Sequence, residues 1–288
     1  MNCIIVGNTN IGNDLPLSLI AGPCQIESLG HAEHIAGYLT ELASRLGMGF
    51  IFKASFDKAN RTSLDSARGP GMKDGLKVLS EVRKSVGCPV LTDVHDAGQC
   101  GETASVADAL QVPAFLCRQT DLLVAVGTAG KPVNLKKGQF LAPWDMVHAV
   151  AKVESTGNRN IMLCERGTCF GYNSLVVDIR SIPVMKKTGY PVVIDATHSV
   201  QIPGGHGTSS GGQREFAPVI ARAAVSIGVA AVFIETHEDP ARAPSDGPNM
   251  VPLGSMPGLI ESLREFDLVA KAHPLDGLSE AHSEDDGL

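Results

Sequence analysis

The sequence lacks an excess of positive charge. It has 24 Lys and Arg residues against 31 Asp and Glu, a formal net charge of −7 over 288 residues. Five of the acids lie in the final stretch, residues 276–288, which has no Lys or Arg, so the rest of the chain is close to neutral. A chain with this balance has no broad basic surface for a nucleic acid or an anionic membrane. Cations grouped locally on such a body indicate a small anionic ligand.

The sequence also lacks long apolar runs and paired cysteines. No run approaches the roughly 20 apolar residues that span a bilayer. The start, MNCIIVGNTNIGNDLPL, has neither the charged region nor the long apolar core of a signal peptide. Seven cysteines, an odd number without a C-x-x-C pair, argue against a disulfide framework and for a reducing compartment. We therefore expect a soluble, cytoplasmic protein with no membrane or nucleic-acid partner.

What the sequence does contain is a series of eight short apolar or β-branched segments, bounded by Gly, Pro or polar residues. They are residues 17–22, 50–55, 89–94, 109–114, 132–137, 160–166, 191–196 and 230–236. Most intervening segments have helical spacing, although the gaps before the fourth and fifth leave room only for short helices. Alternating apolar strands and helices predict a parallel sheet covered on both faces. Eight such units predict an α/β fold, the closed (β/α)₈ TIM barrel, in one domain.

Three segments are expected along the chain. Residues 1–16 precede the first barrel strand and are predicted to form a cap over the bottom of the barrel. Residues 17–273 form the catalytic barrel. Residues 274–288 are acidic and predicted to be a disordered tail.

Ionisable side chains follow every predicted strand at its C-terminal end, where barrel enzymes place their chemistry. The cations among them are Lys53, Lys58, Arg118, Lys136 and Arg166. Like charges at one barrel mouth repel each other unless a polyanion neutralises them. Phosphate is the obvious partner, because Arg offers a bidentate fork and Lys a point charge. The cations suffice for two phosphate or carboxylate groups. No glycine-rich phosphate loop of the Walker type is present, and GGHGTSSGG, residues 204–212, is predicted to be a lid.

A metal site is predicted where the barrel closes. Closure places the first, seventh and eighth strands side by side, and these lead into Cys24, His198 and Glu235, while Asp246 lies in the loop after the eighth. One thiolate, one imidazole and two carboxylates suit a divalent transition metal. Zinc, iron(II), manganese and cobalt all remain open.

Other residues near the strand ends receive more modest predictions. Asp195 is expected to assist His198, and His95 and His237 are either catalytic or hydrogen-bonded scaffolding. Trp144, the only tryptophan, is predicted to be a packing anchor, and the six cysteines other than Cys24 are predicted to be structural.

Seven longer motifs are recognisable together: IAGPCQIES, FKASFDKANRTS, PAFLCRQTD, NLKKGQFLAPWD, ERGTCFGYNSLVVD, DATHSVQIPGG and FIETHEDP. From about Leu17 to His273, the chain closely resembles the family of 3-deoxy-D-manno-octulosonate 8-phosphate synthases. The related 3-deoxy-D-arabino-heptulosonate 7-phosphate synthases share the barrel and the AGPC segment. They typically carry Lys-Pro-Arg-Thr where this chain has KANRTS, which favours the octulosonate family.

The resemblance implies a reaction and a set of substrate ligands. Phosphoenolpyruvate would condense with D-arabinose 5-phosphate and water to give 3-deoxy-D-manno-octulosonate 8-phosphate and inorganic phosphate, a step towards the Kdo sugar of lipopolysaccharide. Residues implied for phosphoenolpyruvate and its pocket are Lys53, Lys58, Asp93, Gln111, Arg118, Lys136 and Arg166. Those implied for the sugar phosphate are Asn60, Arg61 and Thr62. The catalytic residues inferred with it are Lys58, Asn60, Lys136, Arg166, His198 and Asp246. The resemblance also implies a homotetramer in which a neighbouring subunit helps to bind the sugar phosphate.

The motifs resemble two different branches of the family, one that requires a metal and one that does not. Cys24 and the DATHS segment match the metal-dependent branch, with Cys24, His198, Glu235 and Asp246 as ligands. The SDGPN segment around Asp246 resembles the metal-independent branch, in which Asn replaces the cysteine.

Alternative functions remain open from the sequence. They are a heptulosonate-type synthase that uses erythrose 4-phosphate, and a metal-dependent aldolase or isomerase that acts on a single phosphosugar. A barrel that only binds phosphosugars is disfavoured, because binding alone gives no reason for a four-ligand metal group beside an anion pocket.

Overall fold

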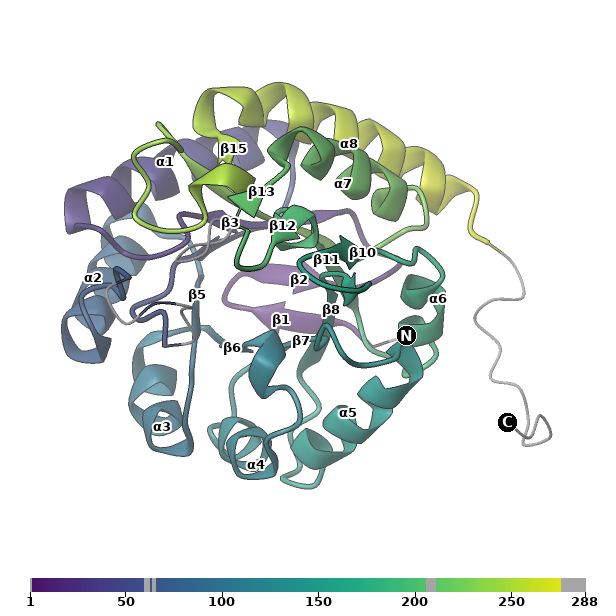
Figure 1. Cartoon of the computed structure of the whole chain (residues 1–288), viewed down its shortest axis with the longest axis horizontal. Helices are drawn as coiled ribbons and strands as arrows, with labels where there is room; N and C mark the ends of the chain where they lie inside the picture. The colour runs from purple at the N-terminus through teal and green to yellow at the C-terminus, as the bar shows by residue number, and fades with distance from the viewer. Residues whose placement is uncertain (1, 60–62, 64–65, 206–210, 276–288) are drawn as a thin grey trace.

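A closed ring of eight parallel strands forms the centre of the computed structural model, which describes residues 2–59, 63, 66–205 and 211–275 (Figure 1). The strands are β3 (Ser18–Gly22), β4 (Phe50–Lys53), β5 (Val90–Asp93), β6 (Ala109–Val112), β7 (Val133–Lys136), β8 (Ile161–Glu165), β11 (Val192–Asp195) and β14 (Ala231–His237). Each pairs with the next, and β14 pairs with both β11 and β3, which closes the ring. The predicted (β/α)₈ barrel is confirmed.

In the part of the chain that the structure describes, eight helices surround the strands (Figure 1). They are α1 (Leu29–Leu46), α2 (Met72–Val86), α3 (Ala97–Val106), α4 (Thr120–Thr128), α5 (Met146–Glu154), α6 (Ser181–Lys186), α7 (Ala217–Val225) and α8 (Met256–Ala272). The first begins where the Ser28 side chain accepts a hydrogen bond from the backbone amide of His31, and it ends at Gly47 in the left-handed conformation. Helices α3 and α4 are short, at 10 and 9 residues, as the tight spacing predicted.

Two apolar layers explain why the barrel strands are buried at every position. Along β3, Leu19 and Ala21 pack in the large cluster between the strands and the helices, whereas Ile20 belongs to a smaller cluster inside the barrel. Successive side chains of a strand point to opposite faces. Because both faces are covered, the strand shows no alternation between apolar and polar residues.

A β-hairpin covers one end of the barrel. Strands β1 (Ile4–Val6) and β2 (Thr9–Ile11) pair antiparallel, and their buried side chains join the cluster inside the barrel. Figure 1 shows the hairpin in the centre of the ring, on the side away from the viewer. Asn13 fixes the chain after it, since its side chain donates to the Tyr190 carbonyl at 3.0 Å and accepts from the Val192 amide at 2.9 Å. The boundaries of the three predicted segments stay a prediction, and residues 276–288 lie outside the described ones.

The loops at the opposite end carry the remaining elements. Short strands β9 (Thr168–Cys169) and β10 (Leu175–Val176) pair with each other, as do β12 (Gln201–Ile202) and β13 (Gly211–Gly212), while β15 (Val251–Pro252) pairs with β14. The described residues also form six 3₁₀ turns: η1 (Ala114–Leu116), η2 (Pro143–Asp145), η3 (His198–Val200), η4 (Arg214–Phe216), η5 (Gly247–Asn249) and η6 (Leu253–Ser255). Of the predicted lid, residues 206–210 lie outside the described residues. Within the described part of the chain, no helix is long and apolar enough to cross a membrane.

Two modest predictions are wrong. Trp144 is 67% exposed on the rim of the barrel and does not anchor the core. Cys3 and Cys169 are exposed as well, whereas Cys88, Cys100, Cys117 and Cys164 are buried as expected of structural cysteines.

Candidate active site

A cavity opens at the C-terminal end of the barrel. The space within it, open solvent at its mouth included, is about 1070 Å³. Six predicted substrate-binding residues line it: Lys53, Lys58, Asp93, Gln111, Lys136 and Arg166. His198 and Asp246 from the predicted metal group line it as well. Residues from seven of the eight strand ends or their following loops therefore meet in one place.

Arg166 brings an unpaired donor to this cavity. The residue is 3% exposed, and its Nη2 donates to Gln201 Oε1 at 3.2 Å, while Nη1 has no hydrogen-bond partner among the described residues. Burial lowers the pKa of Arg166, and nearby acids, first Asp195, oppose that effect. A guanidinium stays protonated in proteins. A buried, charged donor beside Lys136 favours an anionic ligand such as phosphate or carboxylate.

The predicted metal ligands meet below the cavity. Ligand atoms of Cys24, Glu235 and Asp246 all lie within 4.8 Å of one another. The Cys24 thiol contacts Asp246 Oδ2 at 3.2 Å. His198 Nε2 lies 3.6 Å from Glu235 Oε2 and 3.9 Å from Asp246 Oδ2. Strands β11, β14 and β3 lie side by side as predicted, and this places the three strand-end ligands together.

These residues fit a divalent transition metal. Glu235 is 1% exposed, and its Oε2 has no hydrogen-bond partner within the described residues. Burial raises the pKa of Glu235, but the charges of His198 and Lys53 outweigh that effect and lower the pKa to about 2. An ionised, buried carboxylate oxygen without a donor, facing a thiol and an imidazole, is what a metal would satisfy.

Asp195 orients two functional side chains at once. This carboxylate is fully buried and accepts from Lys136 Nζ and, at 2.7 Å, pairs with His198 Nδ1. The backbone amide of His198 also donates to it, at 2.9 Å. Because Nδ1 faces the carboxylate, the Nε2 atom of His198 is directed at the metal group. The prediction that Asp195 assists His198 agrees with this geometry.

A second buried network holds the lysines of the cavity. Lys53 Nζ donates to Glu235 Oε1 at 2.9 Å and lies 3.6 Å from Asp93 Oδ2. Asp93 also accepts from Ser55 and Gln111. Burial lowers the pKa of Lys53, but Glu235 and Asp93 outweigh that and raise it above its usual value. Lys53 is therefore charged, and its ammonium group pairs with two carboxylates of the protein. Because Glu235 belongs to the metal group and Asp93 lines the cavity, Lys53 connects the two.

Gln201 was missed by the sequence reading, and it bridges the two halves of the site. Its Oε1 accepts from Arg166, and its Nε2 donates to Asp246 Oδ1 at 3.0 Å. Glu165 was missed too, although it accepts from the backbone amides of Arg166 and Gly167 at 2.8 and 2.7 Å. No sequence signal singles out Gln201, because a glutamine in a loop has the same appearance in the sequence whether or not its amide contacts Arg166 and Asp246 in the fold.

Some predicted residues do not join this cavity. Arg118 is exposed and lines a separate hollow with His148 and Lys152, so the described structure does not bring it to the other cations. Asn60, Arg61 and Thr62 lie outside the described residues. The roles predicted for all four stay predictions.

Comparison with known proteins identifies the family. The DAHP synthetase I family matches residues 3–271. A protein of Bradyrhizobium sp. (strain BTAi1 / ATCC BAA-1182) named 2-dehydro-3-deoxyphosphooctonate aldolase is 61% identical over 274 residues, 95% of this chain and 96% of the relative. This chain belongs to the 2-dehydro-3-deoxyphosphooctonate aldolases of the DAHP synthetase I family. Proteins of the same name from Granulibacter bethesdensis and Nitrobacter winogradskyi are 60% and 61% identical, each over 93% of this chain and 95% and 94% of their own lengths.

Family membership confirms the resemblance found in the motifs. The 2-dehydro-3-deoxyphosphooctonate aldolase relatives cover almost the whole chain, so the anion pocket and the metal group both lie inside the shared region. The described residues of this aldolase family member hold side-chain groups able to bind a metal, and the identity of the metal is open.

Proposed function

We propose that this chain condenses phosphoenolpyruvate with D-arabinose 5-phosphate and water, giving 3-deoxy-D-manno-octulosonate 8-phosphate and inorganic phosphate for Kdo biosynthesis. The observation that carries the proposal is the meeting of Lys58, Lys136 and Arg166 in one cavity that Asp246, a member of the Cys24, Glu235 and Asp246 group, also lines. Both substrates are phosphorylated and one also has a carboxylate, which suits this density of cations. The relatives' name points to the same product class.

The cations hold phosphoenolpyruvate and stabilise charge. Arg166 offers its unpaired Nη1 to the phosphate or the carboxylate, and Lys136 lies beside it in the same cavity. Negative charge accumulates on the phosphate oxygens as the carbon–oxygen bond breaks and phosphate leaves. Fixed cations near those oxygens stabilise that charge without reorganising. They also keep the enol carbon in contact with the aldehyde it attacks.

The metal group completes the proposal, with Cys24, His198, Glu235 and Asp246 as ligands. A divalent ion held there would polarise the aldehyde or lower the pKa of the attacking water. The protein's own part is orientation. Asp195 holds His198 Nδ1, Gln201 donates to Asp246, and Lys53 neutralises Glu235 from the side away from His198.

The decisive experiment is phosphate release with each candidate sugar. We expect release from phosphoenolpyruvate to require arabinose 5-phosphate and to be at least tenfold slower with erythrose 4-phosphate. Lys136→Ala and Arg166→Ala should each weaken phosphoenolpyruvate binding or turnover, since a charge-assisted contact contributes about 1.5–3 kcal/mol. Lys77→Ala is the control, because Lys77 is exposed on α2 and pairs only with Asp74. Wild-type kinetics in both pocket variants would overturn the anion-site assignment.

The sugar phosphate is proposed to bind at Asn60, Arg61 and Thr62. Their segment follows β4, the strand that ends at Lys53 and leads into Lys58. Arg61→Ala is expected to raise the Michaelis constant for arabinose 5-phosphate more than the one for phosphoenolpyruvate. An effect confined to phosphoenolpyruvate would mean that the two anion sites are exchanged.

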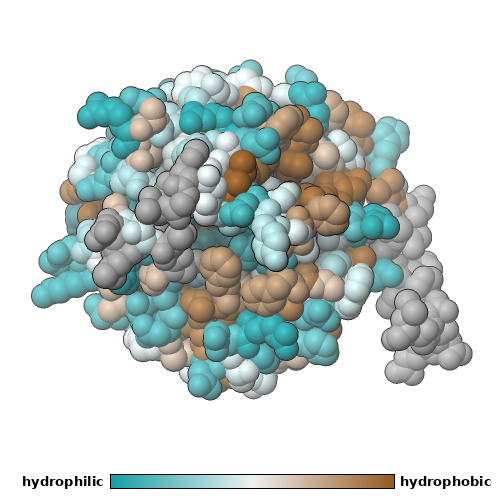
Figure 2. Space-filling view, viewed as in Figure 1, coloured by the Kyte–Doolittle hydropathy of each residue, from teal (hydrophilic) through white to brown (hydrophobic). Residues whose placement is uncertain are grey.

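We further propose that the enzyme acts in the cytoplasm as a homotetramer. Large aromatic side chains are exposed in the segments that follow β6, β7 and β8, and Figure 2 shows hydrophobic surface gathered around the centre of this face. They are Phe115, Phe140, Trp144, Phe170 and Tyr172, exposed by 52 to 99%. Monomeric proteins rarely expose such a concentration of aromatic surface. Sedimentation at assay concentration should give the mass of four chains, and a monomer would refute the assembly.

A further inference from the structure

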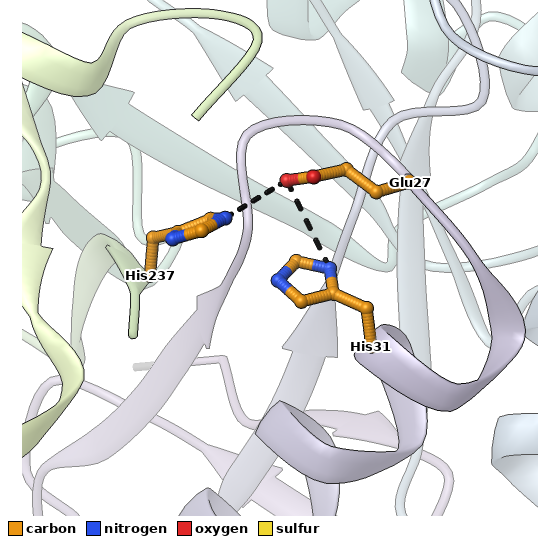
Figure 3. Close-up of side chains that lie close together, drawn as sticks. All are labelled: Glu27, His31 and His237. Atoms are coloured by element: carbon orange, nitrogen blue, oxygen red, sulfur yellow. Dashed lines mark hydrogen bonds and ion pairs between the residues drawn. The ribbon is translucent and has the colours of Figure 1, made fainter. Parts of the chain in front are cut away.

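A second group of metal-binding side chains lies beside the candidate active site. Glu27 comes from the loop between β3 and α1, His31 from the first turn of α1, and His237 from the end of β14 (Figure 3). Glu27 Oε1 lies 3.0 Å from His237 Nε2 and 3.9 Å from His31 Nδ1. The three ligand atoms are all within 4.8 Å of one another. The chemistry proposed above uses none of them.

One nitrogen in this group lacks a partner. The His31 side chain is 10% exposed, and its Nδ1 finds no hydrogen-bond partner among the described residues. On the other side of the ring, Nε2 lies 3.0 Å from Glu238 Oε2. A carboxylate only accepts, so Nε2 carries a proton, and the ring in its neutral form presents the lone pair of Nδ1 to Glu27. In that form two electron-rich atoms face each other at 3.9 Å, and a cation between them would satisfy both.

His237 can turn its lone pair to the same point. Its Nδ1 accepts from the Asp239 amide at 2.9 Å and lies 3.7 Å from Glu238 Oε2. For His237 to bind a metal through Nε2, its proton must lie on Nδ1. The protonated Nδ1 would then donate to Glu238 and would no longer accept from the Asp239 amide. The Asp239 amide then loses its acceptor, but Asp239 is exposed and water can replace it. Glu238 would hold both rings from outside, the carboxylate–histidine–metal arrangement of known metal centres.

We propose that Glu27, His31 and His237 form a second divalent-metal site, preferring Zn²⁺, separate from the Cys24 group. Two imidazoles and one carboxylate are a common zinc ligand set, with water in the fourth position. Tetrahedral zinc with bonds of 2.0–2.1 Å places its donors about 3.3 Å apart. The two separations, 3.0 and 3.9 Å, lie on either side of that value. The side chains therefore need only small rotations to close around an ion.

The proposed ion would clamp the barrel where its first and last units meet. Glu27 is three residues after Cys24, and His237 is two residues after Glu235, so the ion would join the segments that carry two ligands of the active site. An ion that binds only the folded chain raises its stability with the logarithm of the ion concentration, once that concentration exceeds the dissociation constant. The expected signature is a rise in melting temperature with added zinc.

The test is zinc stoichiometry by equilibrium dialysis and elemental analysis. Wild type should bind two zinc ions per chain, and His31→Ala and Glu27→Gln should each bind one. His34→Ala is the matched control: His34 is an exposed histidine on the same helix, outside the group, and its variant should keep two. Glu238→Gln should weaken the second site by about 10–100-fold without removing it.

A second readout separates the two sites. Cys24→Asn should lose one zinc ion and keep the one held by His31. Cobalt bound to that variant should show ligand-field bands without thiolate charge transfer, and adding His31→Ala should abolish them. Equal zinc binding by His31→Ala, Glu27→Gln and wild type overturns the proposal, as does an equal loss in His34→Ala. Loss of zinc in the Cys24 variant alone would support only the active-site metal.

Discussion

Replacing Asp195 by asparagine should expose how much the site depends on one buried charge. The carboxylate pairs with Lys136 and His198, and the exposed fraction of Lys136 is only 5%. Burial raises the pKa of Asp195, but His198 and Lys136 together lower it far below the ordinary value, so the group is ionised at neutral pH. Asp195→Asn keeps the shape and removes the charge, which leaves a buried ammonium without a counter-ion.

The magnitude follows from that geometry. Removing one partner of a buried ion pair typically costs about 3–5 kcal/mol. For a chain of this size we expect a fall in melting temperature of about 10 °C. Turnover should fall as well, since Lys136 and His198 both lose the group that orients them. Urea unfolding followed by circular dichroism, and kcat/KM for phosphoenolpyruvate, measure the two effects.

A surface pair supplies the control for this prediction. Asp178 pairs with Arg180 at 2.8 Å, but their side chains are 51% and 86% exposed. Asp178→Asn should change the free energy of unfolding by less than about 1 kcal/mol, because exposed pairs contribute little. If Asp195→Asn is as stable and as active as Asp178→Asn, the central role assigned to Asp195 is wrong.

Three further predictions test other parts of the structure. In Gly22→Ala the new Cβ would lie 2.1 Å from the Lys53 carbonyl oxygen, so β3 and β4 must separate, at a cost of about 1–3 kcal/mol in urea unfolding. Cys24→Asn should contain no tightly bound metal by elemental analysis, yet keep some turnover in the presence of a chelator. The prediction is contradicted if the wild-type protein contains no metal and its turnover does not change when chelator is added. Burial lowers the pKa of Lys186 from 10.5 to about 8. Between these two pH values Lys186 is protonated in the unfolded chain but not in the folded one, so wild-type stability should rise with pH there. Lys186→Met should therefore be more stable than wild type by about 1 kcal/mol at pH 7, discounted for partial exposure, and the difference should shrink by pH 10.

The barrel could be predicted from the sequence because its strands are short, mostly apolar and buried on both faces. The ends of the strands were less certain. The segment predicted as 109–114 stops at Val112, because Pro113 has no amide to donate and a 3₁₀ turn follows. The hairpin before the barrel was not predicted, since its two three-residue strands are too short to show a periodic pattern.

The candidate metal group could be predicted because barrel closure alone brings Cys24, His198 and Glu235 to neighbouring strand ends. Contacts set by loop conformation could not. Gln201 reaches Arg166 and Asp246 only because the backbone after η3 turns back over the cavity.

Two further features also depend on tertiary structure. In the sequence, His31 looks like any histidine in the first turn of a helix, and its nearness to His237, with ring centroids 4.8 Å apart, is a property of the closed barrel. Trp144 misled the prediction because large aromatics are usually buried, whereas this one lies on the rim.

The hairpin at the base of the barrel also constrains the order of folding. The ribosome makes it before any strand of the barrel, yet Asn13 finds its partner at Tyr190, 177 residues later. Closing a loop of that length costs roughly 4–5 kcal/mol in chain entropy. Only a nearly complete ring of strands offers enough apolar surface to offset this cost, so Ile4, Val6 and Ile11 should dock late. A segment that is synthesised before the whole barrel would then be among the last to reach its native position.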